Sequence, residues 1–376
     1  KFVLLLILDT DMQMLKKNFR GIMSLIKRVL FLSFFMTAGL LLVSSPAIAK
    51  KKLVSVKATT PIVLDAVAEK AWDNANSITV KLGKLPYKPN NGYAGMKKTN
   101  LRIKSLYDDN SIYFFIQYAD PTKSMARFPW VKQADGSWKQ LVNKDSTGHY
   151  NTYYEDKLGM YWNINATGFE KKGCYSTCHR TKDGMNNGIK DSSAGRKYTK
   201  NEGETVDMWH WKGVRTDPLG IFDDQFVNSN RDPKKNKSWG RKGDSKLGGG
   251  YKNNVNKSKT GPAYMNSPYS QDSKYYVTPW AKTKFVDTFK TGDIVPGIVL
   301  DAFTGHRADI KVKSHWKDGQ WTLEVKRALV TTGKNAKIQD VQFDDMGKTY
   351  HFGISVFDNS QINHLFHNSA IEMTFQ

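Results

Sequence analysis

The chain has 376 residues and a net charge of +22 at pH 7, with 39% hydrophobic and 12% aromatic residues. This composition supplies enough apolar residues for a sizeable core, and the aromatic share favours β-structure. The charge favours acidic partners, and because no recognised nucleic-acid-binding motif accompanies it, nucleic acid is not an expected partner.

The N-terminal region predicts export. From Met23 the sequence reads MSLIKRVLFLSFFMTAGLLLVSSPAIAK, which combines a basic start, an apolar run and a small-x-small cleavage site ending at Ala49. This is the three-part layout of a secretory signal peptide. We therefore expect residues 23–49 to be the signal peptide, and residues 1–22 to be an upstream extension that is not in the real product.

The apolar run is also informative through its length. A membrane span needs about 20 residues, and the apolar run at residues 29–43 is shorter than that. We expect the mature protein, residues 50–376, to have no membrane span and to lie in the periplasm; an uncleaved N-terminal anchor is the alternative. Residues 1–49 carry six Lys/Arg and two Asp/Glu, so about +18 remains after cleavage. That charge predicts fast, salt-sensitive association with an acidic protein.

The remaining chain predicts strands rather than long helices. In chain order, the segments with the clearest patterns are a helical turn at 64–75, a hairpin at 101–120, a strand at 156–165, a hairpin at 308–329 and a strand at 349–358. Both hairpins turn on Asp-rich or Gly-containing sequences, which suit tight turns. Strands at this density indicate a mainly β fold, organised as a single β-sandwich.

Residues 225–275 interrupt this pattern. They are rich in Lys, Asn, Ser and Gly, and they offer few residues for burial. We interpret them as a long, mobile, basic loop insertion in the sandwich, either simply solvated or used to dock an acidic partner. Just before them, Asp223-Asp224 could bind a cation or cap a helix, and capping is the interpretation that we adopt.

The two cysteines lie in one short motif, GCYSTCHR at residues 173–180, which contains Cys174, Cys178 and His179. Covalent c-type haem sites use Cys-x-x-Cys-His, one residue shorter. The extra residue can bulge outward while Cys178 and His179 keep their spacing, so we predict haem c. A Cys174–Cys178 disulfide is the alternative in an oxidising compartment. Zinc would need a distant fourth ligand.

The chain resembles the haem-binding domain family of ethylbenzene dehydrogenase gamma subunits and of cytochrome c-552 and dimethyl sulfoxide dehydrogenase-type proteins. The segments that carry the resemblance, in order, are residues 63–75, 101–122, 207–225, 315–329 and 356–366. The second ends in an aromatic-x-Asp-Pro-Thr element, and the third contains Trp209, Trp211 and Lys212. The resemblance implies a β-sandwich similar to carbohydrate-binding and DOMON-type modules, with one haem held at an end of the sandwich.

The resemblance also implies two axial iron ligands. Dehydrogenase gamma subunits hold haem b through a methionine and a lysine, and this chain has its cysteine motif and the segment NHLFHNS at the corresponding places. We therefore expect His179 on one side of the iron and His364 on the other. The alternatives for the second ligand are His367, His210 and Met185. Trp209 and Trp211 are expected to pack around the porphyrin.

Together these features predict an exported monohaem c-type cytochrome that carries electrons. No nucleophile–base pair, paired acid, phosphate loop or dinucleotide fingerprint is visible in the sequence, so we expect no catalytic site. By family analogy it could serve a molybdenum oxidoreductase as a subunit or partner. The alternatives are a non-redox carbohydrate- or ligand-binding β-sandwich module, and a haem enzyme or gas sensor with an open iron position.

Overall fold

The computed structural model describes residues 51–376, apart from 87–88, 147, 180–184, 187–188 and 191–195. The expected signal peptide and upstream extension lie outside the described residues. So do the side chains of Cys178, His179 and Met185, whose backbone alone is described. Within the described part, no helix is long and apolar enough to cross a membrane.

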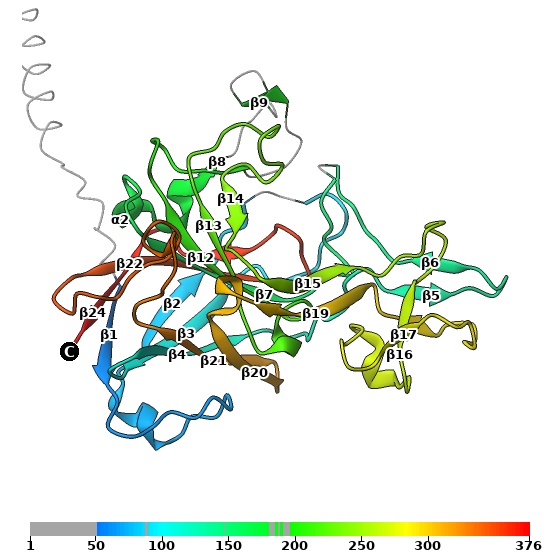
Figure 1. Cartoon of the computed structure of the whole chain (residues 1–376), viewed down its shortest axis with the longest axis horizontal. Helices are drawn as coiled ribbons and strands as arrows, with labels where there is room; N and C mark the ends of the chain where they lie inside the picture. The colour runs from blue at the N-terminus through cyan, green and yellow to red at the C-terminus, as the bar shows by residue number, and fades with distance from the viewer. Residues whose placement is uncertain (1–50, 87–88, 147, 180–184, 187–188, 191–195) are drawn as a thin grey trace, which may run out of the picture. The chain divides into compact units, whose positions relative to one another are not determined.

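Among the described residues, thirteen strands form one large sheet (Figure 1). In spatial order its main path is β14 (Arg241–Gly243), β13 (Asp223–Val227), β12 (Val206–Lys212), β7 (Lys157–Asn163), β22 (Tyr350–Phe357), β24 (Ile371–Phe375), β1 (Lys52–Lys57), β3 (Thr99–Tyr107), β4 (Ser111–Ala119), β21 (Gln320–Ala328) and β20 (Lys311–Lys317). Off this path, β2 (Ile78–Leu82) pairs with β3, and β23 (Leu365–Phe366) pairs with β22.

Smaller ladders and short helices decorate this sheet. The ladders are β8 (Cys178–His179) with β11 (Arg196–Lys197), β9 (Met185–Asn186) with β10 (Ile189–Lys190), β15 (Gly248–Asn253) with β19 (Ile298–Thr304), β16 (Tyr264–Asn266) with β17 (Lys282–Lys284), and β18 (Ile294–Val295) with β5 (Trp130–Lys132) and β6 (Trp138–Gln140). The helical turns are η1 (Lys70–Asn74), α2 (Phe169–Lys172), η2 (Gly173–Thr177), η3 (Asp217–Leu219), η4 (Gln271–Lys274), η5 (His306–Ala308) and α3 (Ala336–Gln339).

The large sheet curls so that its two halves enclose one core. Phe114 on β4 packs against Trp162 on β7, with ring centroids 5.6 Å apart, and against Trp209 on β12 at 5.9 Å. An isolated bridge between Ile221 and Lys311 links the chain just before β13 with β20. The buried cluster contains apolar residues from both halves, as expected for facing sheet layers. The expected mainly β, β-sandwich fold is therefore confirmed.

Most strands predicted from the alternation of apolar residues are present. The hairpin expected at 101–120 is β3 and β4, and the one at 308–329 is β20 and β21. The second hairpin turns at Asp318 and Gly319, which both have positive φ, and this geometry matches the twist of the flanking strands. The early helical turn is confined to η1. Asp223 and Asp224 lie in β13, so the interpretation as a helix cap is wrong.

The stretch 225–275 is more ordered than its composition suggests. It contributes the end of β13, then β14, β15 and β16, and Trp239 and Asn254 within it are buried. The stretch thus contains short strands that its composition does not predict, although most of its residues from 228 onward are exposed or half-buried. Among these strands, β15 pairs with the distant β19, whereas β16 pairs with the nearer β17.

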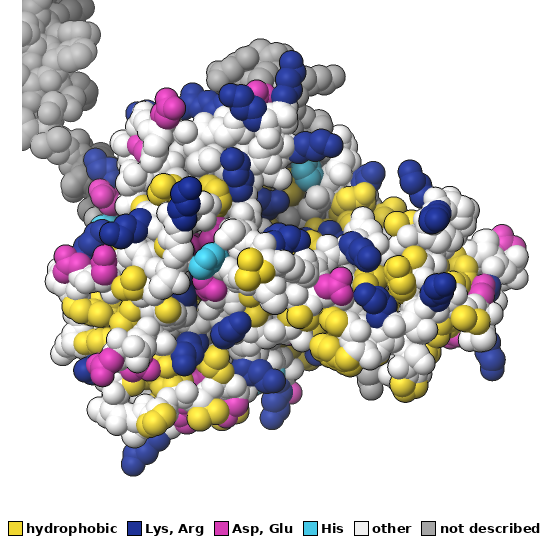
Figure 2. Space-filling view, viewed as in Figure 1, with side chains coloured by type: hydrophobic (Ala, Val, Ile, Leu, Met, Phe, Trp, Pro, Cys, Tyr) yellow, Lys and Arg dark blue, Asp and Glu magenta, His cyan; other side chains and the backbone are white. Residues whose placement is uncertain are grey.

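The surface carries the excess of basic side chains. Figure 2 shows Lys and Arg spread over the visible face, with fewer Asp and Glu between them. The side chains of Lys234, Lys235, Lys257 and Lys259 in the 225–275 stretch are all exposed. Such separated surface charges act mainly through the long-range field of the molecule, which salt screens.

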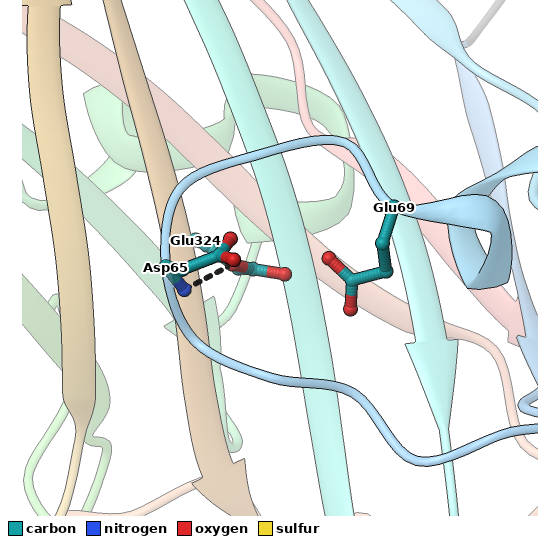
Figure 3. A group of neighbouring side chains, drawn as sticks. All are labelled: Asp65, Glu69 and Glu324. Atoms are coloured by element: carbon teal, nitrogen blue, oxygen red, sulfur yellow. Dashed lines mark hydrogen bonds between the residues drawn. The ribbon is translucent and has the colours of Figure 1, made fainter.

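Glu324 anchors the N-terminal segment to the sheet. Its carboxylate accepts hydrogen bonds from the backbone N–H groups of Asp65 and Ala66, both at 3.0 Å, and from Nε1 of Trp72 at 2.8 Å. Figure 3 shows it beside the carboxyl groups of Asp65 and Glu69. Three donors therefore stabilise this buried carboxylate, and they fix the loop that precedes η1.

Candidate functional site

A cavity of about 380 Å³ lies on the outer face of the sheet, over β7, β12 and β22. Alternate residues of these strands line it, because successive side chains of a strand point to opposite faces. The lining residues from the three strands are Lys157, Gly159 and Tyr161, then Met208 and His210, then Ser355 and Phe357. The intervening residues of each strand point into the sandwich core.

The same alternation places Trp209 and Trp211 in the core. Both are fully buried, and neither lines the cavity. Nε1 of Trp209 donates to Asp207, and the Trp211 ring packs on Trp321 with centroids 4.8 Å apart. The structure thus does not bring these two tryptophans to the cavity with His210, and we leave them out of the candidate site.

Cys174 lies in the wall of the cavity. It belongs to η2, which packs on β22 at Gly353, where an added Cβ atom would lie only 2.7 Å from N of Cys174. At the start of η2, Gly173 has φ +57° and lies close to the backbone of Ser369. Two glycines therefore allow the cysteine segment to approach the sheet closely, as Gly does where backbones come together.

The rest of the cysteine motif continues along the cavity edge. In β8, Cys178 is opposite Lys197 and His179 is opposite Arg196 of β11. Both of these basic residues line the cavity. The backbone of the motif therefore passes beside the cavity, while the side chains of Cys178 and His179 lie outside the described residues.

Residues 237–241, within the stretch predicted to be a loop, form another wall. Lys237, Ser238, Trp239 and Arg241 line the cavity. The guanidinium of Arg196 lies 4.7 Å from the Trp239 ring centroid, within the range of a cation–π contact. The sequence gives no local signal for this wall, because a single tryptophan among polar residues does not reveal what it packs against.

His364 lines the cavity, and His367 does not. Nδ1 of His364 lies 2.6 Å from the carbonyl oxygen of Ile362. A carbonyl oxygen only accepts hydrogen bonds, so Nδ1 carries the proton and Nε2 carries the lone pair. Burial, together with the charge of Lys197, lowers the pKa of His364 to about 3. The ring is therefore neutral at pH 7, the form that binds metals.

His210 lines the same cavity, and both of its ring nitrogens are buried and have no hydrogen-bond partner among the residues that the structure describes. Burial lowers the pKa of His210 well below its usual range, and the nearby charges of Lys212 and Lys157 act in the same direction. An unsatisfied buried N–H costs about 1–3 kcal/mol, so such a group indicates a missing partner. The rings of His210 and His364 both pack beside the Phe357 ring, with ring centroids 5.9 Å and 4.7 Å from it, respectively.

The cavity is strongly basic. Its lining, taken over the described residues, includes no Asp or Glu, and its basic members are Lys157, Arg196, Lys197, Lys237 and Arg241. Nζ of Lys157 donates to the carbonyl oxygen of Gln361 at 2.7 Å and lies 3.9 Å from the Phe357 ring centroid. Burial, with the neighbouring Arg215, lowers the pKa of Lys157 well below its usual range. The cavity is therefore suited to an anionic group with an aromatic body.

Several lining residues were not singled out from the sequence. They include His149, Tyr161, Met208 and Phe366. Met160 on β7 is fully buried in the core. The backbone of Met185 lies in β9, and its side chain is outside the described residues. The signal that could have found Met208 is its position two residues before His210 on the same strand.

Comparisons with known proteins give the family. A search of curated proteins finds no match. Two solved structures of a family 9 carbohydrate-binding module from Caldicellulosiruptor kristjanssonii are similar to this chain over 87% of its length. The complex with glucose has 11% sequence identity, a TM-score of 0.32 and 96% of its own chain covered. The complex with cellotriose has 12% sequence identity, a TM-score of 0.31 and 94% of its own chain covered. The model of the ethylbenzene dehydrogenase family matches residues 69–369, so the chain belongs to that family.

Proposed function

We propose that the protein is an exported monohaem c-type cytochrome, with haem c attached through Cys174 and Cys178. His179 is the proximal iron ligand in this proposal, and His364 is the ligand on the other side. The observation that carries the proposal is that Cys174 and His364, nearly 200 residues apart in sequence, line one cavity. One cysteine of the proposed attachment motif and a neutral histidine thus line the same cavity.

The residues around the cavity fit this cofactor in three respects. The basic side chains Arg196, Lys197 and Arg241 can neutralise the two haem propionates. Aromatic walls at Phe357 and Trp239 suit a planar apolar ring. The ring nitrogens of His210 have no hydrogen-bond partner among the described residues, so a bound cofactor could supply that partner, or His210 could itself bind the iron.

The chain's own contribution is to hold and tune the group. Bound haem supplies the one-electron chemistry of its iron. The carbonyl oxygen of Ile362 fixes the tautomer of His364 and orients its Nε2, as carbonyl groups do for metal-ligating histidines. Buried basic residues around the cavity favour the reduced state of any redox centre there, because they oppose added positive charge.

Location and partners belong to the same proposal. The signal peptide would be cleaved after Ala49, and the mature protein would act in the periplasm. Membership of the ethylbenzene dehydrogenase family supports a role as an electron-transfer subunit or partner of an oxidoreductase, and a molybdenum enzyme is our specific proposal. The basic surface favours an acidic redox partner.

Covalent attachment gives the sharpest test. The protein should be produced with its export and haem-attachment machinery, denatured, separated by gel electrophoresis and stained for haem. We expect the wild-type band to stain and a Cys174→Ala/Cys178→Ala variant to lose the stain, because thioether bonds alone survive denaturation. The sequence has no cysteine outside this motif, so the double variant tests the motif alone. A variant at Met160, which is buried in the core, is the control for general destabilisation.

An unstained wild-type band would overturn the cytochrome c proposal. If non-denatured protein then still carried haem, the cavity would hold haem b. A protein without any haem under these conditions would instead favour a non-redox module that binds an anionic ligand in the basic cavity.

A further inference from the structure

Four buried carboxyl groups meet where β12, β13 and β14 lie side by side (Figure 1). Asp207 lies on β12, Asp224 on β13 and Asp340 at the end of α3, and one oxygen of each lies within 4.8 Å of the others. Asp244, directly after β14, places its carboxyl group against that of Asp340. All four are at least 96% buried. This group, named the four-aspartate cluster here, is separate from the cavity.

Each carboxylate of the four-aspartate cluster has oxygens without a hydrogen-bond donor. In three of the aspartates one oxygen accepts a hydrogen bond. Asp207 accepts from Nε1 of Trp209 and N of Val341. Asp224 accepts from N of Gln225, and Asp340 accepts from Oγ1 of Thr331. The oxygens without a donor are Oδ1 of Asp207, Oδ2 of Asp224, Oδ1 of Asp340 and both oxygens of Asp244. Ligands of a metal ion show this division, with one oxygen oriented by the protein and the other facing the ion.

The charge of the cluster is also unbalanced. Arg327 is the basic side chain beside it, with Nη2 at 3.8 Å from Asp207 and 3.9 Å from Asp340. One guanidinium thus faces four carboxyl groups in the protein interior. Burial and mutual repulsion raise the pKa of Asp207 to about 7 and that of Asp244 to about 9. Buried charges of one sign need a counter-charge, and the chain supplies a single one.

Two other carboxyl groupings show that burial alone does not produce this pattern. At Glu324 (Figure 3), both carboxylate oxygens accept N–H donors. In the buried group of Asp120, Asp156 and Asp358, backbone and side-chain donors serve every carboxylate oxygen except Oδ2 of Asp120. The four-aspartate cluster differs because five of its eight carboxylate oxygens lack a donor.

We propose that Asp207, Asp224, Asp244 and Asp340 bind a calcium ion. The donors are all carboxylate oxygens, which suit a hard cation and not zinc or copper. Magnesium usually keeps several of its own waters, whereas calcium accepts many protein oxygens in a flexible arrangement. A buried site with four carboxylates from four separate segments therefore favours calcium. Asp244 is the independent sign of a ligand. It reaches the cluster from the 225–275 stretch and faces the carboxyl group of Asp340, and among the described residues no N–H or hydroxyl group donates to either of its buried oxygens.

The ion would join two parts of the fold. Asp244 follows β14, whose first residue, Arg241, lies in the cavity wall together with Trp239 just before the strand. Asp207 and Asp224 belong to the adjoining strands of the sandwich. A calcium ion between them would fasten this wall to the large sheet. The proposal does not depend on what occupies the cavity.

The test uses the mature chain after treatment with a calcium chelator. Titration with CaCl₂ in a calorimeter should show one site, and saturating calcium should raise the unfolding temperature by several degrees, because a ligand that binds only the folded state stabilises it. Asp224→Asn and Asp244→Asn should each lose this rise. Asp120→Asn, in the other buried group, is the matched control and should keep it.

The change in unfolding temperature of a variant without calcium shows whether its aspartate binds the ion or has only a structural role. In chelator, Asp224→Asn should unfold no lower than the wild type, because it removes one of four repelling carboxyl groups. Terbium gives a second measurement on the wild type alone, since Trp209 beside Asp207 can sensitise its emission, and calcium should quench that emission by displacement. Absence of both calcium heat and terbium emission in the wild type, or a calcium-dependent rise that persists in both variants, would overturn the proposal.

Discussion

His364 shows how one backbone contact can prepare a side chain for metal binding. The carbonyl oxygen of Ile362 holds the proton on Nδ1, and burial keeps the ring neutral. His367 also has its Nδ1 near a carbonyl oxygen, that of Ser369 at 2.8 Å, but it does not line the cavity. The two histidines therefore differ in their position relative to the cavity.

This difference predicts the outcome of two substitutions. If the protein binds haem c, His364→Ala should open the sixth iron position, so that the ferrous protein binds carbon monoxide and its low-spin spectrum is lost. His367→Ala should leave the spectrum unchanged, because its ring does not reach the cavity. Optical spectra of the reduced proteins with and without carbon monoxide provide the measurement.

His210 offers the competing result. Its two ring nitrogens have no partner among the described residues, so either could face the iron. If His210→Ala opened the iron to carbon monoxide and His364→Ala did not, the ligand assignment would be wrong and the cytochrome proposal would stand.

At the scale of elements, the close approach of η2 to β22 positions the cysteine motif. The contact needs a residue without a side chain at Gly353, because a Cβ atom there would lie 2.7 Å from N and 3.0 Å from Cβ of Cys174. The segment that would have to move is backbone, which cannot yield as a flexible side chain can. Strand β22 thus sets the distance between Cys174 and the strand residues that line the cavity.

If haem is attached to Cys174 as proposed, Gly353→Ala should lower the yield of covalently attached haem. We expect η2 to be pushed outward and the free energy of unfolding to fall by about 1–3 kcal/mol, a typical cost of overpacking. Gly83→Ala, where the nearest atom to an added Cβ is 4.0 Å away, should change neither quantity. Haem content per protein and denaturant unfolding are the measurements, and wild-type haem content in Gly353→Ala would contradict the positioning role.

Sequence patterns predict these elements unevenly. The hairpins β3–β4 and β20–β21 follow from alternation and turn residues, since their pairing is local. Strand β15 does not, because its Gly-rich and polar sequence is stabilised by β19, which lies far along the chain. In the site, the cysteine motif is predictable from its residue types and spacing, and His364 from the resemblance to the family. The wall at Trp239 and the four-aspartate cluster are not, because tertiary packing alone brings their segments together.

At the scale of the whole molecule, the positive charge is spread over an ordered surface. The exposed lysines of the 225–275 stretch flank strands that belong to the fold and to the cavity wall. Deleting the stretch would therefore destroy structure as well as charge. Only substitutions at exposed positions can separate the electrostatic effect from the structural one.

Reversing two of these charges tests the docking role. Lys257→Glu/Lys259→Glu should slow electron transfer with an acidic redox partner at low salt, and the difference from wild type should shrink as salt rises, because screening acts beyond about 8 Å at physiological ionic strength. Lys313→Glu/Lys317→Glu on β20 changes the net charge equally and is the control for position. Stopped-flow rates over a range of salt give the comparison. Equal slowing by both pairs would mean that net charge, and no local docking surface, controls association.

The position of β1 has a consequence for the order of assembly. This strand pairs in parallel with β3 on one side and with β24 on the other, so that Lys52 is opposite Glu372 near the end of the chain. The large sheet therefore has a seam that β24 closes. Until β24 has been synthesised, the two halves of the sheet lack their connection through β24 and β1, so the interior of the sandwich stays accessible while most of the chain has already been made.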